Sequence, residues 1–391
     1  MSFIETAAAA GYQAFQGLRA TPSVRGRTVV VVGASAGIGR SVALEYARGG
    51  AEVLLCARRA AELEQVTGEC LAAGAAAAHW VAGVLHEAAA AAGYQAFQGL
   101  RATPSVRGRT VVVVGASAGI GRSVALEYAR GGAEVLLCAR RAAELERVAG
   151  ECVAAGAAAA HWVAGDVTRL ETQLAVRERA GRSWDRVDYL VLCAGALSVQ
   201  AVVDLWGMRQ GGGGALRAAD GAAAERADRA LRRIMDVNVH APAALAALLL
   251  PLVAAGRGVI VVVASAAGLM AAPTRALYSA SKHAVAAYFD ALRMEVRGLG
   301  VAVTVAYPGS VDTALRHSAV DAPAAAAAPP PAASAGPRMA PAECARRIVR
   351  AAALRRRALV TPWPYAAAAL LHAVAPALVD ALAERKYRQR A

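Results

Sequence analysis

Thr110-Val-Val-Val-Val-Gly115-Ala-Ser-Ala-Gly119-Ile-Gly121 is the stretch that decides the fold of this 391-residue chain. The β-branched run predicts a buried parallel strand, and the pattern that follows the glycines predicts a helix. Glycine suits this loop because the backbone must turn tightly and let a pyrophosphate approach the helix N-terminus, whose free N–H groups favour anions. A second strand is expected at Glu134-Val-Leu-Leu137. We therefore predict an α/β fold with a doubly wound parallel sheet (a Rossmann fold), whose first dinucleotide contacts are Gly115, Ser117, Gly119, Ile120 and Gly121.

A second group of residues indicates proton transfer. Lys282 is one of only two lysines in a chain whose other basic residues are arginine, and it lies in Tyr278-Ser-Ala-Ser-Lys282. Tyr and Lys at this spacing share one face of a helix, where the ammonium can lower the phenol's pKa from its usual value of about 10. Ser265 follows the apolar run 259–263 and is expected at a strand end, and Asn238 is the only asparagine. Alone, the Tyr–Lys pair would equally suit a surface helix; with these partners it predicts a catalytic site.

The residues after the second strand discriminate between cofactors. About twenty residues past the glycines, an NAD-binding protein of this fold presents Asp or Glu to the ribose hydroxyls. This chain presents Cys138-Ala-Arg140-Arg141 instead. A guanidinium binds phosphate bidentately, whereas a carboxylate would repel a 2′-phosphate. We therefore predict NADP(H), bound through Arg140 and Arg141; a solvated start to the next helix is the alternative.

Together these motifs resemble the short-chain dehydrogenase/reductase family over about residues 105–390. The resemblance implies that Tyr278 is the general acid/base, that Lys282 lowers its pKa and holds the nicotinamide ribose, and that Ser265 orients the carbonyl. Asn238 would hold a water in the proton relay. Tyr278 and Lys282 would also contact the cofactor, and the resemblance adds further cofactor contacts at Asp166, Val167, Ala194, Gly195, Pro308, Gly309, Val311 and Thr313.

Two departures from the family pattern and one likeness refine this assignment. Val114 stands where the family has Thr, and Leu192-Cys-Ala-Gly195 replaces Asn-Asn-Ala-Gly, so we expect altered stability rather than lost chemistry. The segment 341–350 and the apolar tail 365–382 resemble the hydroxysteroid dehydrogenase branch, in particular its 11-beta-hydroxysteroid dehydrogenase type 1-like members. That resemblance implies a hydrophobic small-molecule substrate, a lipid-like or steroid-like carbonyl or secondary alcohol.

The chain also contains an internal repeat. Residues 5–83 recur as 87–165 with only four differences, at positions 6/88, 65/147, 67/149 and 71/153. The first copy includes a second glycine loop, Gly33 to Gly39, but no catalytic Tyr and no later strands. It could form a second nucleotide site; we interpret it as a redundant half-domain. The second copy is contiguous with Asp166 and the fourth strand, so we predict that it builds the catalytic domain and that deleting residues 1–84 leaves activity intact.

The expected organisation has four parts. Residues 1–92 are the duplicated partial segment, 93–320 the single catalytic domain, 321–337 an Ala/Pro-rich linker in the substrate-loop region, and 338–391 a C-terminal helical extension. Residues 207–229, with four consecutive glycines, are expected to form a flexible insertion before the helix that carries Asn238.

The amino-acid composition limits which other functions the protein could have. A net charge of +14 could indicate a nucleic-acid binder, but the arginines are scattered, aromatic residues make up 5%, and no nucleic-acid module is recognised. We therefore expect no nucleic-acid partner. A catalytically silent NADPH-binding regulator is a further alternative, against which the complete Asn/Ser/Tyr/Lys set argues. The six cysteines lack Cys-x-x-Cys spacing, so neither a metal site nor a disulfide framework is expected.

The sequence at the two ends of the chain bears on where in the cell the protein is located. Residues 1–6 do not resemble a signal peptide, and no transmembrane helix is evident. The apolar tail around 370–379 is interrupted by Pro376 and followed by basic residues, so it could lie in a membrane interface or pack on the domain or a partner. We expect a homodimer that is cytoplasmic or peripheral on an intracellular membrane, such as the endoplasmic reticulum or a lipid droplet.

Overall fold

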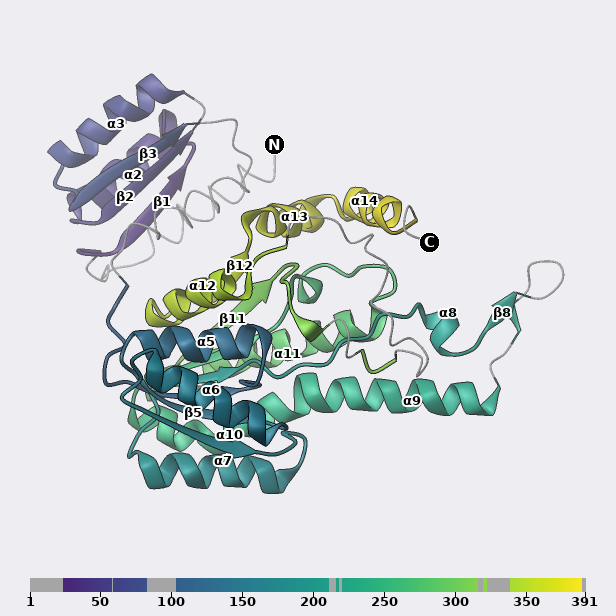
Figure 1. Ribbon diagram of the computed structural model, residues 1–391. Coiled ribbons are helices and arrows are strands. Elements are labelled where there is room, and N and C mark those ends of the chain that lie inside the picture. Colours follow the sequence, from purple (N-terminus) through teal and green to yellow (C-terminus); the bar gives the residue numbers. More distant parts are fainter. Residues whose placement is uncertain are drawn as a thin grey trace. The chain divides into compact units, whose positions relative to one another are not determined.

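The computed structural model describes residues 24–57, 59–82, 103–210, 216–217, 220–315, 319–321 and 338–388. The chain divides into two units, Met1–Ala102 and Thr103–Ala391. Each unit has its own parallel sheet, and each is described separately below (Figure 1).

The larger unit contains a seven-stranded parallel sheet in the order β12-β11-β10-β7-β4-β5-β6. Strand β4 pairs with β5 on one side, where Val112 faces Leu136, and with β7 on the other, where Val112 faces Leu190. The strand order therefore reverses beside β4, and in sheets of this kind ligands bind at the carboxyl ends of the strands on either side of such a reversal, here β4 and β7. The strands are β4 (Thr110–Val114), β5 (Glu134–Ala139), β6 (Ala159–Ala164), β7 (Tyr189–Leu192), β10 (Val259–Val263), β11 (Ala302–Pro308) and β12 (Ala358–Thr361).

Helices cover both faces of this sheet, so the predicted doubly wound α/β fold is confirmed. Strand β4 shows why its apolar run is continuous: Val111 and Val113 belong to one core cluster, and Val112 and Val114 to the other. One face carries α5 (Gly119–Arg130), α6 (Ala142–Ala154) and α12 (Pro341–Ala353). The other carries α7 (Leu170–Ser183), α10 (Ala241–Ala255) and α11 (Ala276–Glu295) (Figure 1).

The insertion predicted at 207–229 is partly helical, so that prediction was wrong for residues 221–229. Helix α9 (Gly221–Met235) begins where the Asp220 carboxylate accepts a hydrogen bond from the Ala223 backbone N–H at 2.6 Å. Before it lie α8 (Val202–Leu205) and a small hairpin of β8 (Arg209–Gln210) and β9 (Leu216–Arg217). The four glycines at 211–214 lie outside the described residues.

Helix α9 continues through a π-helical turn, η2 (Asp236–His240), directly into α10. By length and composition alone, this stretch from Gly221 to Ala255 could cross a membrane, although the sequence analysis expected no such helix. Its apolar side chains include Leu245, Leu249 and Val253, which lie in the core cluster beneath the sheet. Packing in the domain core therefore accounts for its apolar composition.

The C-terminal part contributes a strand as well as helices. Strand β12 pairs with β11 at the sheet edge and is followed by α13 (Trp363–Val374) and α14 (Pro376–Arg388). The core thus extends into the segment expected to be a helical extension. Of the expected linker, residues 322–337 lie outside the described residues, whereas Asp321 is described and buried.

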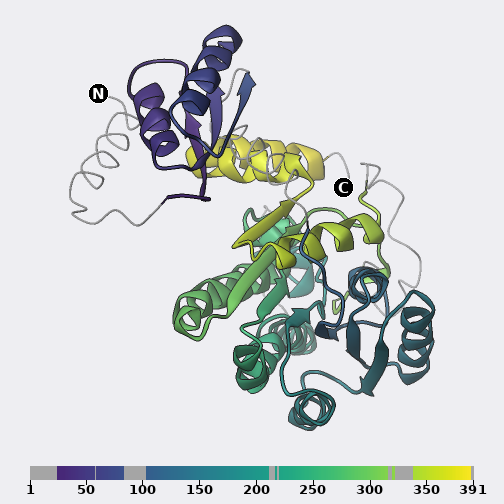
Figure 2. The same ribbon diagram turned by 90° about the vertical axis from the view of Figure 1, so that its left-hand side faces the viewer.

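The smaller unit repeats the first half of the larger one. It comprises β1 (Thr28–Val32), α2 (Gly37–Arg48), β2 (Glu52–Ala57), α3 (Ala60–Ala72) and β3 (Ala77–Ala82), in a parallel sheet ordered β1-β2-β3 (purple in Figures 1 and 2). Among the strands that the structure describes, β1 pairs with β2 alone, whereas its counterpart β4 pairs with both β5 and β7. As a consequence Val32 is 47% exposed, whereas the equivalent Val114 is 1% exposed.

Candidate active site

The glycine loop after β4 packs too closely for any side chain. Gly115 has a φ of +85°, and a Cβ there would lie 2.6 Å from the backbone nitrogen of Ala194. A Cβ on Gly121 would lie 2.2 Å from the carbonyl oxygen of Gly115. The loop therefore closes on itself and on the segment after β7, as a dinucleotide-binding turn requires.

The N-terminus of α5 is suited to an anion. The helix begins at Gly119 without a side-chain cap and without an acidic residue in its first turn. Its first backbone N–H groups are therefore left for a ligand. Thr313, from the loop after β11, borders this loop: a Cβ on Gly119 would lie 3.2 Å from the Thr313 methyl carbon. These residues fit a dinucleotide pyrophosphate held between the two loops.

Arg140 and Arg141 lie where β5 ends, next to the glycine loop. Arg141 Nη2 donates a hydrogen bond to Ser117 Oγ at 3.2 Å, and both arginines are exposed. No described carboxylate forms an ion pair with either guanidinium. Two positive charges therefore stand beside the predicted phosphate loop, while Ile120 packs against the core beneath α5.

Asp166, which follows β6, has both carboxylate oxygens occupied. It accepts hydrogen bonds from the Thr168 N–H at 3.0 Å and from Arg233 Nη2 at 2.9 Å. Burial raises the pKa of Asp166, but the hydrogen bonds from Thr168 and Arg233 outweigh it and bring the pKa to about 2. The carboxylate is therefore ionised at neutral pH. Arg233 comes from α9 and was not singled out in the sequence, while Val167 is buried in the core.

Lys282 is buried beside Tyr278. Its ammonium, 4% exposed, donates to the carbonyl oxygen of Val263 at 3.0 Å and lies 5.8 Å from the centroid of the Tyr278 ring. Burial lowers the pKa of Lys282 to about 8. The i,i+4 spacing thus brings cation and phenol together, and the hydrogen bond ties Lys282 to the strand that ends before Ser265.

Asn238 lies in the π-helical turn and is buried. Its Oδ1 accepts from the Ala196 N–H at 2.7 Å, and its Nδ2 donates to the Ala196 carbonyl at 3.0 Å and to Ser281 Oγ at 2.9 Å. The side chain thereby connects the segment after β7 to α11. Gly195 lies beside it, because a Cβ there would lie 3.4 Å from Asn238 Oδ1 and 3.6 Å from Lys282 Nζ.

Ser265 follows β10 and caps a short 3₁₀ helix, η3 (Ala266–Gly268). Its Oγ accepts a hydrogen bond from the Ala267 N–H at 3.2 Å, which leaves the hydroxyl hydrogen available to donate. A Cβ on Gly268 would lie 2.7 Å from the carbonyl oxygen of Lys282. Glycine at that position therefore lets η3 lie directly against α11, which brings Ser265 to the helix that carries Tyr278.

The loop after β11 is held by the C-terminal part of the chain. Strand β11 ends at Pro308, and a Cβ on Gly309 would lie 2.1 Å from the ring of Tyr365, a residue of α13. The Tyr365 hydroxyl donates to Ser310 Oγ at 3.2 Å, and Val311 forms a β-bridge with Met339. Sequence reasoning missed Tyr365: a glycine at a strand end signals close approach but does not name the partner.

Asp321 is a second residue that the sequence analysis missed. Its buried carboxylate accepts hydrogen bonds from Ser198 Oγ at 2.7 Å and from the backbone N–H groups of Val199 and Gln200 at 2.9 Å each. The adjacent Val320 packs against the same buried cluster as Leu277 and Tyr278. Asp321 therefore fixes one wall of the site beside the candidate catalytic tyrosine. Its place at the edge of an Ala/Pro-rich run concealed this role.

The apolar departures from the family pattern pack against each other. Val114 and Leu192 face each other across the β4–β7 pair, and both are buried in the core. Burial raises the pKa of the neighbouring Cys193 thiol to about 12, so this cysteine remains uncharged at neutral pH. Hydrophobic contact thus replaces the polar groups expected here.

Comparison with known proteins places these features in a family. A family model described as short chain dehydrogenase matches residues 27–100 and 109–324. Hydroxysteroid 11-beta-dehydrogenase 1-like protein A of Xenopus laevis is 32% identical over 288 residues, which are 72% of this chain and 88% of that protein. Dehydrogenase/reductase SDR family protein 7-like of Drosophila melanogaster is 35% identical over 228 residues, 58% of this chain and 64% of that protein.

A solved structure has the same fold. It is an alcohol dehydrogenase from Thermococcus sibiricus complexed with 5-hydroxy-NADP. The TM-score is 0.53 and the sequence identity 21%, over 66% of this chain and 97% of that one.

Proposed function

The chain belongs to the short-chain dehydrogenase family and is an oxidoreductase that acts on CH–OH groups, and from that premise we propose that it interconverts a carbonyl and a secondary alcohol on a lipid-like or steroid-like substrate with NADP(H). One observation carries the proposal. The buried Lys282 ammonium lies beside the Tyr278 ring and is hydrogen-bonded to the strand that precedes Ser265. This arrangement provides a phenol tuned for proton transfer next to a hydroxyl that can bind a substrate oxygen.

Each residue has a distinct task in the proposed reaction. When bound, the nicotinamide cofactor supplies or accepts the hydride. In reduction Tyr278 gives its phenolic proton to the substrate oxygen, and in oxidation it takes that proton back. Ser265 donates a hydrogen bond to the same oxygen, and the charge of Lys282 favours the phenolate.

Asn238 has a positioning task. Both of its amide donors are used within the protein, so a water of the proton relay would have to bind its Oδ1 or its backbone carbonyl. Its side chain holds the segment after β7 against α11, and this contact keeps Gly195 next to Lys282.

The preference for NADP(H) rests on Arg140 and Arg141. Exchanging both for Gln removes the guanidinium partners of a 2′-phosphate, so we expect kcat/KM with NADPH to fall by about tenfold or more while kcat/KM with NADH changes little. Arg147→Gln, an exposed change on α6, is the matched control. Equal losses with both cofactors would show that the two arginines do not read the 2′-phosphate.

The exposed side chains of the C-terminal helices support contact with a membrane surface. Helices α13 and α14 expose Trp363, which is 65% exposed, together with Leu371, Leu378 and Leu382. We propose that this surface docks peripherally on an intracellular membrane, in a protein that forms a homodimer. Apolar side chains of this kind lie well at the interface between headgroups and acyl chains.

Two substitutions test the tail without disturbing the site. Truncation at Pro362 would remove Tyr365 from Gly309, so Leu378→Asp with Leu382→Asp is the cleaner change. We expect this variant to lose cosedimentation with vesicles while its kcat/KM on a soluble substrate is kept. If vesicle binding is unchanged but a dimer dissociates in size-exclusion chromatography, the surface is a subunit interface instead.

The reaction itself is tested with a substrate panel. NADPH oxidation is followed at saturating cofactor with steroid, retinoid, long-chain and small aromatic carbonyls, and NADPH binding is measured in parallel. We expect turnover, highest for the large apolar carbonyls. Tight NADPH binding without turnover of any carbonyl would instead favour the catalytically silent regulator.

A further inference from the structure

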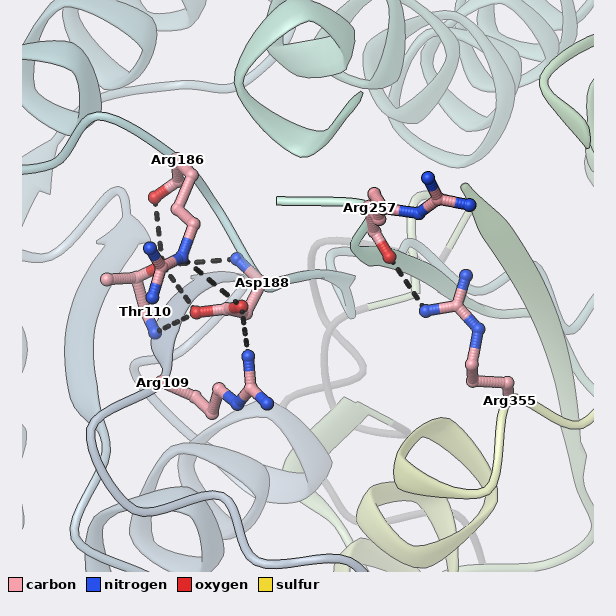
Figure 3. A network of polar contacts seen from close by, with 6 residues as sticks. All are labelled: Arg109, Thr110, Arg186, Asp188, Arg257 and Arg355. Atoms are coloured by element: carbon pink, nitrogen blue, oxygen red, sulfur yellow. Dashed lines mark hydrogen bonds and ion pairs between the residues drawn. The ribbon is translucent and has the colours of Figure 1, made fainter. Parts of the chain in front are cut away.

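A basic cavity lies at the opposite end of the sheet from the candidate active site. It has a volume of about 240 Å³ and is bordered by the amino ends of β4, β7 and β10. Arg109, Arg257 and Arg355 are among the residues that line it, and Asp188 is the one acidic residue there (Figure 3). We call this site the basic cavity.

The single carboxylate is already committed. Asp188, which is 4% exposed, accepts hydrogen bonds from Arg109 Nη1 at 2.9 Å and from the Thr110 N–H at 3.0 Å. Arg186 also contributes a charge, since its Nε lies 3.7 Å from the same carboxylate. In Figure 3 these groups gather around Asp188, away from Arg257 and Arg355. Asp188 is thus already paired with arginines of its own, and it offers no counter-charge to Arg257 and Arg355 on the other side of the basic cavity.

Arg257 and Arg355 have no acidic partner among the described residues. Arg355 donates to the carbonyl oxygens of Arg257 at 2.7 Å and of Gly300 at 2.5 Å, which are neutral acceptors. The guanidinium of Arg257 lies over Gly300, where a Cβ would be 2.9 Å from Arg257 Nε. Two guanidinium charges are therefore held close together with no counter-charge, an arrangement that an anion would stabilise.

The backbone at both arginines favours a different residue. Arg257 follows the C-cap of α10 with a φ of +46°, and Arg355 follows the C-cap of α12 with a φ of +51°. Helices usually place glycine there, because other L-residues are strained in the left-handed region. A helix dipole favours a cation anywhere in the last turn and so does not explain this strained position. Arginine at two such positions facing one cavity indicates that the side chains serve a ligand.

We propose that the basic cavity binds a phosphate-type dianion, either a free phosphate group or the phosphomonoester headgroup of phosphatidic acid. Arginine forks match the oxygens of a tetrahedral oxyanion. Gly256 and Gly258 line the basic cavity on either side of Arg257 and add no side chains of their own. The ligand would hold together the amino ends of three central strands, so its binding is expected to stabilise the fold.

Thermal unfolding of the full chain tests this proposal. The melting temperature is measured in inorganic phosphate and in sodium chloride of matched ionic strength, and we expect phosphate to raise it. Arg257→Gly places glycine at the left-handed position, so the protein without phosphate should melt no lower than the wild type. The same change should weaken phosphate binding by about tenfold or more. Arg346→Gln removes an exposed charge from α12 outside the basic cavity and should keep the full response.

The glycine loop is the competing anion site, and a variant distinguishes the two. A phosphate response that survives Arg257→Gly but disappears in Arg141→Gln would place the anion at the loop and overturn the proposal. No response of the wild type to phosphate would overturn it as well.

Vesicles identify the source of the phosphate group. Cosedimentation with phosphatidylcholine vesicles that contain phosphatidic acid, lost in Arg257→Gly and competed by free phosphate, would assign the basic cavity to the lipid headgroup. A phosphate-dependent shift in melting temperature without Arg257-dependent vesicle binding would assign it to a soluble phosphate.

Discussion

At the scale of single residues, Lys282 opposes folding. Its pKa of about 8 lies below the 10.5 of an ordinary lysine because burial disfavours the charged form. At about 1.4 kcal/mol per pKa unit, holding this charge in the folded protein at neutral pH costs about 3 kcal/mol. Between about pH 8 and 10.5 the unfolded chain binds the proton and the folded chain does not, so stability rises with pH through that window. A cost of this kind is expected where a charge serves chemistry.

Lys282→Met should therefore be more stable and inactive. We expect the free energy of unfolding at pH 7 to increase by about 1–3 kcal/mol, since the buried charge is removed while one hydrogen bond is lost. The gain should shrink at pH 10, where the wild-type lysine is largely neutral in the folded state. Urea unfolding at both pH values measures this. A variant equally destabilised at pH 7 and pH 10 would contradict the assignment of a buried charge.

The repeat provides matched glycines for a second prediction. Gly115 and Gly33 occupy the same place in the two copies with φ values of +85° and +77°, but an added Cβ would have other atoms within 4 Å only at Gly115. Gly115→Ala should cost about 1–3 kcal/mol more than Gly33→Ala through overpacking against Ala194, and it should abolish NADPH binding. Gly33→Ala should leave NADPH affinity unchanged. Isothermal titration calorimetry with NADPH measures the affinity of both variants. Equal losses of NADPH affinity would show that both loops bind the cofactor.

At the scale of elements, packed loops complete the site that the strands begin. The loop after β11 is held by Tyr365 of α13, and the segment 319–321 is held by Asp321. Arg275, just before α11, donates to the carbonyl of Val199 at 3.0 Å, so the start of the helix that carries Tyr278 contacts the same segment that Asp321 binds. The position of Tyr278 therefore depends on contacts between segments far apart in the sequence.

Asp321→Asn tests this dependence. All partners of the carboxylate are donors, so an amide NH₂ would face N–H or O–H groups and at least one hydrogen bond would be lost. With about 1.5–3 kcal/mol for a charged hydrogen bond, we expect kcat/KM for the carbonyl substrate to fall about tenfold or more while the Kd of NADPH stays constant. Asp312→Asn is the control, because Asp312 is an exposed carboxylate that, like Asp321, follows β11. A parallel loss of NADPH affinity would indicate general unfolding instead.

The elements also show what sequence can reveal. Strands β4 and β10 match their apolar runs because burial on both faces demands continuous β-branched residues. The first part of helix α9, residues 221–229, was missed because its Ala, Arg and Asp composition suggested a flexible insertion, although Asp220 is a helix N-cap and Ala223, Ala227 and Ala230 lie on one buried face. The contacts of Tyr365 and Asp321 join segments that are far apart in the sequence, so no local sequence pattern could predict them.

At the scale of the whole molecule, the repeat is a comparison of one sequence in two contexts. Both copies form the same strands and helices, because local propensity and the contacts within the half-domain are the same. The second copy packs with β7, α7 and α10, and its first strand, β4, is buried throughout, whereas the equivalent strand β1 is not. Local sequence thus determines the half-domain, and we propose that the remainder of the chain determines whether it can bind the cofactor.

Removal of residues 1–84 should therefore leave kcat/KM within about twofold of the full chain, because every proposed catalytic and cofactor residue is retained. We also expect the truncated protein to aggregate less, since an unpaired strand edge promotes association. NADPH titration should give one site per chain before and after truncation. Two sites in the full chain, or loss of cofactor binding after truncation, would contradict the view of a redundant copy.

The proton-transfer role of Tyr278 is the central claim, and single-turnover reduction of the best carbonyl substrate with NADPH bound tests it most directly. Tyr278→Phe removes one hydroxyl, and Tyr288→Phe removes another from the exposed face of the same helix. We predict that Tyr278→Phe slows the chemical step by at least about 10²-fold with an unchanged Kd for NADPH, whereas Tyr288→Phe reacts at the wild-type rate. A Tyr278→Phe protein that reduces the substrate as fast as the wild type would show that the proton comes from another group.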